Sequence, residues 1–123
     1  MNKMIQSMRC ALKGILFALL HERNMRVHLA VFVLAISAAY LLKISRVDFL
    51  IIIAMSALVF SLELANTAIE QLADRVLPEQ DFIIGRVKDL MAGAVLLAST
   101  FSLIIGFSIF YTPVLKLLSN KSL

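Results

Sequence analysis

The chain has 123 residues, of which 61% are hydrophobic and 16% are charged. This composition excludes an ordinary soluble domain, in which about a quarter of the residues are charged. The net charge of +4 does not indicate nucleic-acid binding, because the lysines and arginines lie at the ends of long apolar segments and form no single patch. A single cysteine, Cys10, rules out an intramolecular disulfide and a multi-cysteine metal site. We therefore expect one lipid-embedded domain over residues 1–123.

The first segment, residues 2–21, is amphipathic at helical spacing. Its polar residues share one arc of a helical wheel, opposite an apolar arc: Asn2, Lys3, Gln6, Arg9 and Lys13. This pattern predicts a helix that lies in the membrane surface. A cleaved signal peptide is not expected, because Lys13 interrupts the apolar stretch and no small-x-small cleavage site follows it.

Three apolar segments follow, at about 27–44, 49–73 and 90–111, and each is near the roughly 20 residues that a spanning helix needs. Residues 44–48 are predicted to form a short turn and residues 77–85 a longer loop. The second segment carries acidic residues, so either its membrane part ends near Leu64 and the helix continues into water through Asp74, or the helix is bent or tilted. The predicted fold class is an all-α membrane protein with an amphipathic surface helix and three transmembrane helices.

The distribution of basic residues predicts the orientation, because cytoplasmic segments carry more lysine and arginine. One side has Lys3, Arg9, Lys13, Arg23, Arg26, Arg75, Arg86 and Lys88, and the other has Lys43, Arg46, Lys116 and Lys121. We therefore expect a multi-pass protein of the cytoplasmic (inner) membrane, with the amino terminus on the cytoplasmic side.

Small residues recur at every fourth position in two of the predicted spans. They are Ala57, Ser61 and Ala65 in the second span and Ala94, Ala98, Ser102 and Gly106 in the third. Such stripes allow helix backbones to approach closely, although an alanine-rich chain also produces them by chance.

The most informative polar residues lie in the second span. Glu63, Glu70 and Asp74 project along one line of a helix, and Asn66 and Thr67 flank them. A carboxylate in a span costs about 2.5 to 3.5 kcal/mol, so three on one face require an explanation. They could bind a cation, for which Mg²⁺ is suited by its preference for carboxylate oxygens and phosphates. They could also pair with basic residues to hold the helices together, the candidates being Arg23, Arg26, Arg75 and Lys88.

Other polar residues lie at the same boundary. Lys88 and Asp89 open the third span, where the lysine could hold a phosphate or anchor the helix in the interface. His28 is interpreted as an interfacial hydrogen-bonding residue and is not included in the candidate site. Neither G-x-x-x-x-G-K-[ST] nor G-x-G-x-x-G occurs, so any ATP site must be built from side chains on helices.

Four stretches together resemble the prokaryotic diacylglycerol kinase family, which includes the bacterial undecaprenol kinases. They are residues 13–14, 22–28, 63–74 and 88–96. The third and fourth carry the pattern E-x-x-N-[ST]-A-I-E-x-x-x-D followed by K-D-x-x-x-x-A-V. Residues 81–84 are less polar than the stretch expected there. The resemblance therefore does not extend to a contact between this loop and nucleotide.

The resemblance implies an ATP- and Mg²⁺-dependent lipid kinase that forms homotrimers, with sites shared between subunits. Glu63 would be the general base for the lipid hydroxyl, and Glu22 and Glu70 would ligate Mg²⁺. The implied nucleotide-binding residues are Asn66, Lys88 and Asp89, with Asp74 and Lys13 as weaker candidates.

The choice of lipid alcohol stays open between two substrates. Residues 22–28 and 40–45 look more like undecaprenol kinases, which would supply lipid phosphate for envelope lipid recycling, than like diacylglycerol kinases making phosphatidic acid. Two hypotheses from other classes are a small multidrug-type transporter and a non-catalytic assembly subunit. A transporter normally needs a fourth span and a carboxylate near the bilayer centre, and an assembly subunit has no use for Glu63.

Overall fold

The computed structural model describes residues 2–76 and 81–121, and within them the fold consists of four α-helices. They are α1 (Lys3–His21), α2 (Arg23–Leu41), α3 (Arg46–Val76) and α4 (Phe82–Asn120). The last three are long and apolar enough to cross a membrane. The predicted all-helical fold with three spans is confirmed.

The helix α1 begins and ends at identifiable residues. The Asn2 side chain accepts a hydrogen bond from the Met4 backbone N–H at 3.2 Å, which caps the amino end. Glu22 adopts an extended conformation with φ −102° and ψ 116°, so the helical path is broken between α1 and α2. Arg26 crosses this break, since its Nη1 donates to the carbonyls of Leu19 at 3.2 Å and Leu20 at 2.9 Å. The break therefore has a defined geometry.

The connection between α2 and α3 is shorter than expected. Residues 44–48 were predicted to form a turn, but α3 already begins at Arg46. The Ser45 hydroxyl accepts a hydrogen bond from the Asp48 backbone N–H at 3.1 Å, which caps the helix at that point. Lys43 has a positive φ of 52°, which reverses the chain within the turn.

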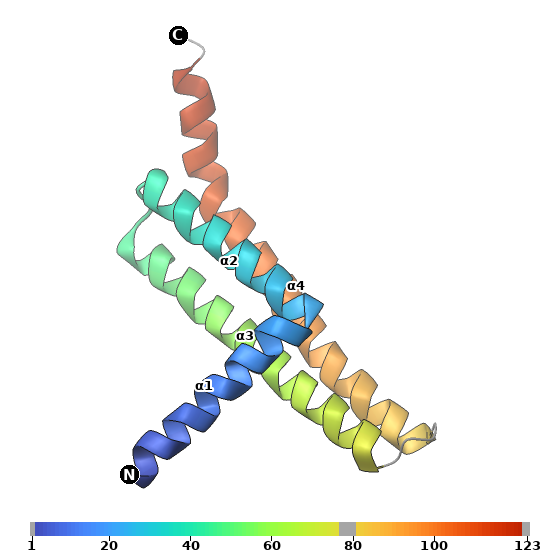
Figure 1. Ribbon diagram of the computed structural model, residues 1–123. Helices are drawn as coiled ribbons and strands as arrows, with labels where there is room; N and C mark the ends of the chain where they lie inside the picture. The colour runs from blue at the N-terminus through green and yellow to red at the C-terminus, as the bar shows by residue number, and fades with distance from the viewer. Residues whose placement is uncertain (1, 77–80, 122–123) are drawn as a thin grey trace.

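The helix α4 also begins earlier than expected. Of the predicted loop 77–85, residues 77–80 lie outside the described residues, but residues 82–85 are helical and the loop prediction is wrong for them. The Asp81 carboxylate accepts from the backbone N–H groups of Ile83 at 2.8 Å and Ile84 at 3.1 Å, and this cap starts the helix. The helix continues beyond the predicted span end at Tyr111 and contains Pro113. Its carboxyl-terminal part turns away from the bundle (Figure 1), as expected where proline removes a backbone hydrogen bond.

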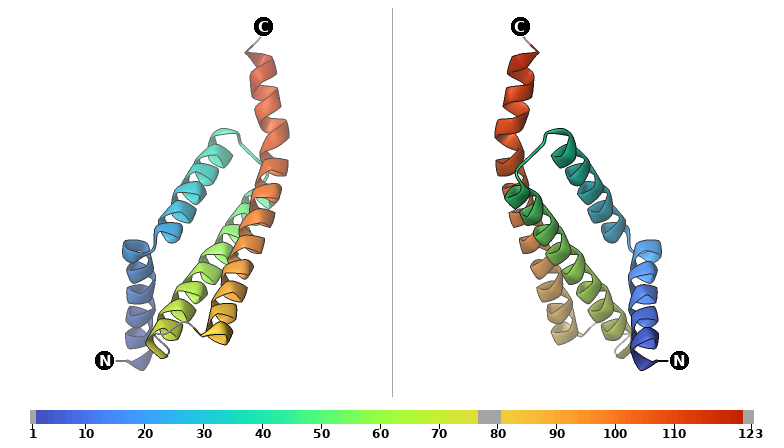
Figure 2. Two further views of the ribbon diagram at one scale, coloured as in Figure 1. Left: turned by 90° about the vertical axis from the view of Figure 1, so that its right-hand side faces the viewer. Right: turned by 90° about the vertical axis from the view of Figure 1, so that its left-hand side faces the viewer.

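The three long helices run up, down and up, and α1 leaves them at an angle (Figure 1). The helices α3 and α4 lie side by side along much of their length, and α2 packs against α3 (Figure 2). The helix α1 meets the others near its carboxyl end, where Ala18 is buried. The end of α3 and the start of α4 lie together at one end of the bundle, and the break between α1 and α2 lies partway along α3 (Figure 2).

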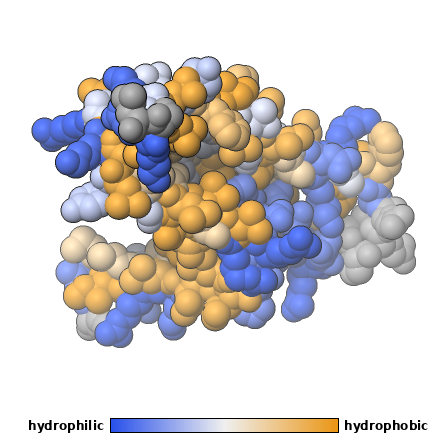
Figure 3. Space-filling view, turned by 90° about the horizontal axis from the view of Figure 1, so that it is seen from above, coloured by the Kyte–Doolittle hydropathy of each residue, from blue (hydrophilic) through white to orange (hydrophobic). Residues whose placement is uncertain are grey.

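Most large apolar side chains of the spans are exposed, as expected where lipid replaces water around a single chain. Figure 3 shows apolar residues in continuous areas on the face that it views, with hydrophilic residues in separate groups. The stripe of small residues on α4 faces the bundle, where Ala98 is buried. The stripe on α3, namely Ala57, Ser61 and Ala65, is exposed and makes no close contact within the bundle among the described residues.

Candidate functional site

The side chain of Glu63 is the largest fully buried side chain among the described residues, with an exposed fraction of 2%. Its Oε2 atom has no hydrogen-bond partner in the described part of the chain. A buried carboxylate without partners is costly and is found where it has a function. Two further polar residues on the same helix, Asn66 and Thr67, are also buried, and the Oδ1 atom of Asn66 lacks a partner too.

The nearest charged or titratable group to this carboxylate comes from α2. His28 Nε2 lies 3.8 Å from Glu63 Oε2. Asn24, one helical turn earlier, is also close enough to interact with the carboxylate. His28 was not among the residues chosen from the sequence, because its contact depends on how α2 packs against α3. Its position four residues after Asn24 on one helix face was the signal that could have found it.

Glu22 and Glu70 both lie near enough to Glu63 to act on it electrostatically. Glu22 sits at the break between α1 and α2, and Glu70 lies two turns after Glu63 on α3; both are half-buried. The structure therefore brings both predicted metal ligands into electrostatic range of the predicted base. None of these three carboxylates pairs with an arginine or lysine in the described residues, so the alternative of pairing with those basic residues does not account for them.

Asp74, by contrast, does form an ion pair with a basic residue. Its Oδ1 atom lies 2.7 Å from Lys88 Nζ, which joins the end of α3 to the start of α4. Lys88 also lies within electrostatic range of Glu70. Two residues predicted to bind nucleotide thus contact each other, beside one of the predicted metal ligands.

The remaining candidates are exposed. Lys13 lies on α1 and Asp89 on α4, and neither makes a hydrogen bond or ion pair within the described residues. The single chain therefore does not bring them into contact with the carboxylates.

The predicted ligands of Mg²⁺ are Glu22 and Glu70. In the described residues no three His, Cys, Asp or Glu side chains are grouped closely enough to enclose a metal ion. Mg²⁺ is usually bound by one or two carboxylates, with phosphate oxygens and water completing the octahedron. Glu22 and Glu70 supply the donor type that this kind of site uses.

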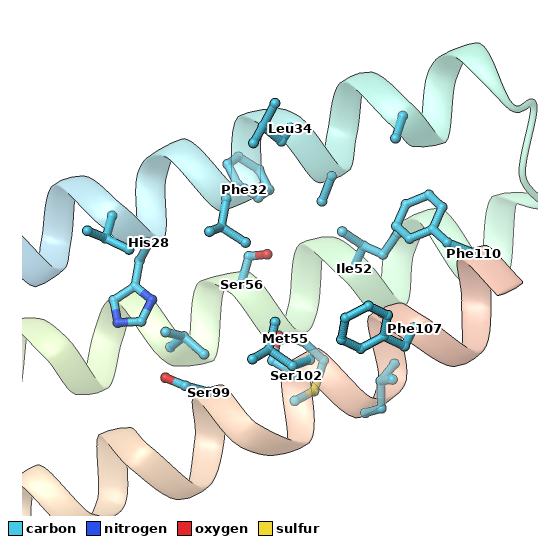
Figure 4. A pocket seen from close by; sticks show the side chains of 18 of the residues that line it. His28, Phe32, Leu34, Ile52, Met55, Ser56, Ser99, Ser102, Phe107 and Phe110 are labelled. Carbon is cyan, nitrogen blue, oxygen red and sulfur yellow. The ribbon is translucent and has the colours of Figure 1, made fainter. Parts of the chain in front are cut away.

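An apolar groove of about 840 Å³ lies between α2, α3 and α4, and His28, the neighbour of Glu63, is among the residues that line it. His28 and Ser99 lie toward one end of it, and Phe107 and Phe110 toward the other (Figure 4). Between them the lining is almost wholly apolar, apart from the hydroxyls of Ser56 and Ser102. The molecule thus combines a buried carboxylate with an apolar groove that begins at the neighbouring His28, an arrangement that suits an enzyme acting on a membrane lipid.

Comparison with known proteins agrees with this class. Residues 9–110 match the family described as prokaryotic diacylglycerol kinase. The chain therefore belongs to that family, a family of lipid kinases.

Three relatives illustrate the match. The chain is 34% identical over 94% of its length to a protein of Synechocystis sp. named diacylglycerol kinase, and it spans 66% of that protein. It is also 34% identical to a protein of Bacillus subtilis named undecaprenol kinase, with 89% of each chain covered. A diacylglycerol kinase of Haemophilus influenzae is 28% identical, over 80% of this chain and 83% of the relative.

Proposed function

We propose that the protein transfers the γ-phosphoryl group of ATP to the hydroxyl of a membrane lipid, with Mg²⁺ as cofactor. The observation that carries the proposal is the buried carboxylate of Glu63, which has an unpartnered oxygen and lies 3.8 Å from His28, a residue that lines the apolar groove. Membership of a lipid kinase family supports it independently.

We assign the residues the roles that the family resemblance implies. Phosphoryl transfer depends mainly on alignment and on neutralising phosphate charge. Glu22 and Glu70 would hold Mg²⁺, which would supply charge neutralisation for the phosphates of bound nucleotide. The lipid hydroxyl attacks the γ-phosphorus, the bond to the bridging oxygen breaks, ADP leaves and Glu63 accepts the hydroxyl proton. Lys88 and Asn66 bind nucleotide, and Asp74 holds Lys88. Asp89 and Lys13 are the weaker candidates, since the single chain does not bring them to the carboxylates.

Undecaprenol is the favoured substrate. The groove is lined along α4 from Ser99 to Leu115, a difference of 16 residues, or about 24 Å at about 1.5 Å per residue. That exceeds half of the roughly 30 Å hydrocarbon core, so one long chain fills it better than acyl chains confined to one leaflet. The product would be a lipid phosphate for envelope lipid recycling. The relatives carry the names of both activities, so diacylglycerol remains the second candidate.

The experiment is a direct assay. Purified protein in mixed micelles receives ATP labelled in the γ-phosphate, Mg²⁺ and either undecaprenol or diacylglycerol. We expect labelled lipid with both Mg²⁺ and lipid present, and faster transfer to undecaprenol. Faster transfer to diacylglycerol would reverse the substrate assignment. Transfer to neither lipid would contradict the kinase proposal and favour an assembly subunit or a transporter.

We also propose how the protein lies in the membrane and how its copies assemble. The excess of basic residues on the side of the acidic residues supports a location of the site at the cytoplasmic face of the inner membrane, where ATP is available. The helix α1, with its apolar face toward lipid, lies in the membrane surface. The exposed small residues on α3, Ala57, Ser61 and Ala65, suit close packing against a second copy, which supports a homotrimer.

A further inference from the structure

Ser99 differs from other hydroxyl residues of the long helices. The hydroxyls of four of them donate to the backbone carbonyl four residues earlier, at 2.8 to 2.9 Å: Ser37, Ser61, Thr100 and Ser108. The Ser99 Oγ atom is buried and has no hydrogen-bond partner in the described residues. A buried hydroxyl without a partner is unfavourable by about 1 to 3 kcal/mol, so a bound ligand that satisfies it gains affinity.

The antiparallel register of α3 and α4 places Ser99 at the depth of Glu63. Asp74 and Lys88 are in contact at the end of the pair. Glu63 lies 11 residues before Asp74, since 74 − 63 = 11, and Ser99 lies 11 residues after Lys88, since 99 − 88 = 11. Equal steps along two antiparallel helices reach the same level, because each residue rises about 1.5 Å.

The helix α2 contributes His28 to the same region as Glu63 and Ser99. It lines the same groove as Ser99, and both lie toward the same end of it (Figure 4). Its Nε2 atom faces Glu63 Oε2 at 3.8 Å, slightly longer than a hydrogen bond. Contacts of this kind are often long without substrate and shorten when it binds. The groups around Glu63 are therefore Asn24 and His28 on α2, Glu22 at the α1 to α2 break, and Glu70 on α3.

We infer that His28 and Ser99 form, with Glu63, the site that receives the hydroxyl of the lipid alcohol at the end of the apolar groove. Ser99 exchanges a hydrogen bond with the lipid oxygen. His28 is a positioning residue: its Nε2–H holds one oxygen of Glu63, so that the other oxygen faces the lipid hydroxyl. Each span thus supplies one residue. This inference rests on the proposed lipid kinase function.

The first test compares two serine variants in the micelle assay with undecaprenol. Ser99→Ala removes the free hydroxyl, and we expect the KM for undecaprenol to rise about three- to tenfold, since one hydrogen bond is lost. The KM for ATP should not change. Ser108→Ala is the matched control, because its hydroxyl already donates to Ile104 within α4. Equal lipid KM values for Ser99→Ala and the wild type would overturn the role of Ser99.

The second test uses the geometry of amide substitutes for His28. Glutamine places its amide nitrogen about where Nε2 of histidine lies, whereas asparagine reaches only as far as Nδ1. His28→Asn should lower kcat about 10- to 100-fold, and His28→Gln should restore most of it. A purely structural role would not distinguish them by donor position, so equal kcat values for the two variants would overturn the positioning role.

A third measurement does not depend on turnover. The chain has two histidines, and His21 bonds to the Phe17 carbonyl at 2.9 Å and stacks on the Phe17 ring. In His21→Gln protein, only His28 contributes an imidazole ¹⁵N signal. We expect that signal to shift on addition of undecaprenol without ATP, and to shift differently in a Glu63→Gln background.

These outcomes separate the two proposals. If the wild type phosphorylates no lipid, the proposed function fails. If the wild type is active and its His28 signal does not respond to undecaprenol, the hydroxyl site is wrong while the kinase function stands.

Discussion

Lys88 Nζ and Asp74 Oδ1 lie 2.7 Å apart and join the end of α3 to the start of α4. Both residues were predicted from the sequence to bind nucleotide, and the structure shows that they contact each other. The pair sets the lysine beside Glu70, a predicted magnesium ligand. An exposed ion pair of this kind adds little to stability. We therefore interpret its role as positioning the Lys88 ammonium group for the proposed contact with phosphate.

This interpretation predicts a non-additive pair of variants. Lys88→Gln should raise the KM for ATP by about tenfold, because a phosphate contact is lost. Asp74→Asn should raise it less, since the lysine remains but is no longer held. In the double variant, Asp74→Asn should add no further effect. Steady-state kinetics over a range of ATP concentrations measures this, and additive effects would show that Asp74 acts independently of Lys88.

A second prediction concerns the break between α1 and α2. Arg26 donates to the carbonyls of Leu19 and Leu20, and so fixes the segment that carries Glu22. Arg26→Ala should therefore raise the Mg²⁺ concentration for half-maximal activity about three- to tenfold, as one carboxylate is placed less precisely. Arg23→Ala is the control, because no hydrogen bond or ion pair of Arg23 is found in the described residues. An unchanged Mg²⁺ requirement in Arg26→Ala would separate this arginine from the metal site.

A third prediction tests the orientation in the membrane. After replacement of Cys10 by serine, single cysteines are introduced at Val76 and at Leu118, which are exposed at opposite ends of the bundle. A membrane-impermeant maleimide applied to intact cells should label the cysteine at position 118 and not the one at position 76. The reverse pattern would place the acidic site outside the cytoplasm, away from ATP.

The long spans could be predicted because continuous apolar segments have few alternatives in lipid. The sequence left open whether the acidic helix bends, and the structure has it as one helix from Arg46 to Val76. The start of α4 was missed because Pro78 and Gly85 suggested a loop, while the capping carboxylate of Asp81 favoured a helix. Glu63 stood out in the sequence as a charge within a span. His28 and Ser99 did not, because their importance comes from helix register, which one sequence does not reveal.

The groove gives a fourth prediction. A Cβ atom added at Gly106 would meet no other atom within 4 Å, and Gly106 lines the groove. Gly106→Phe should therefore fill part of the groove without a backbone clash and lower the rate with undecaprenol, while a short-chain prenol should be phosphorylated almost normally. Leu97→Phe is the control, because Leu97 is exposed and does not line the groove. Equal losses with long and short prenols would indicate that the chain does not lie there.

The last prediction separates the two central acids by the kind of defect that each produces. Glu63→Gln keeps the shape of a buried side chain but removes the proton acceptor, so turnover should fall by about 10² to 10⁴ with little change in nucleotide affinity. Glu70→Gln removes a metal ligand from a cation that is reluctant to dehydrate. Its main effect should be weaker binding of Mg-ATP and a raised Mg²⁺ requirement, measured by varying Mg²⁺ at fixed ATP.

The locations of the two residues explain why their defects should differ. Glu63 is buried beside His28, a residue of the groove, whereas Glu70 is half-buried, lies near Lys88, and is closer to the end of α3. Raising Mg²⁺ should therefore recover part of the activity of Glu70→Gln and none of that of Glu63→Gln. Near-normal turnover of Glu63→Gln in saturating Mg-ATP would show that Glu63 is not the base. Its carboxylate would then serve to hold α2 against α3 through His28.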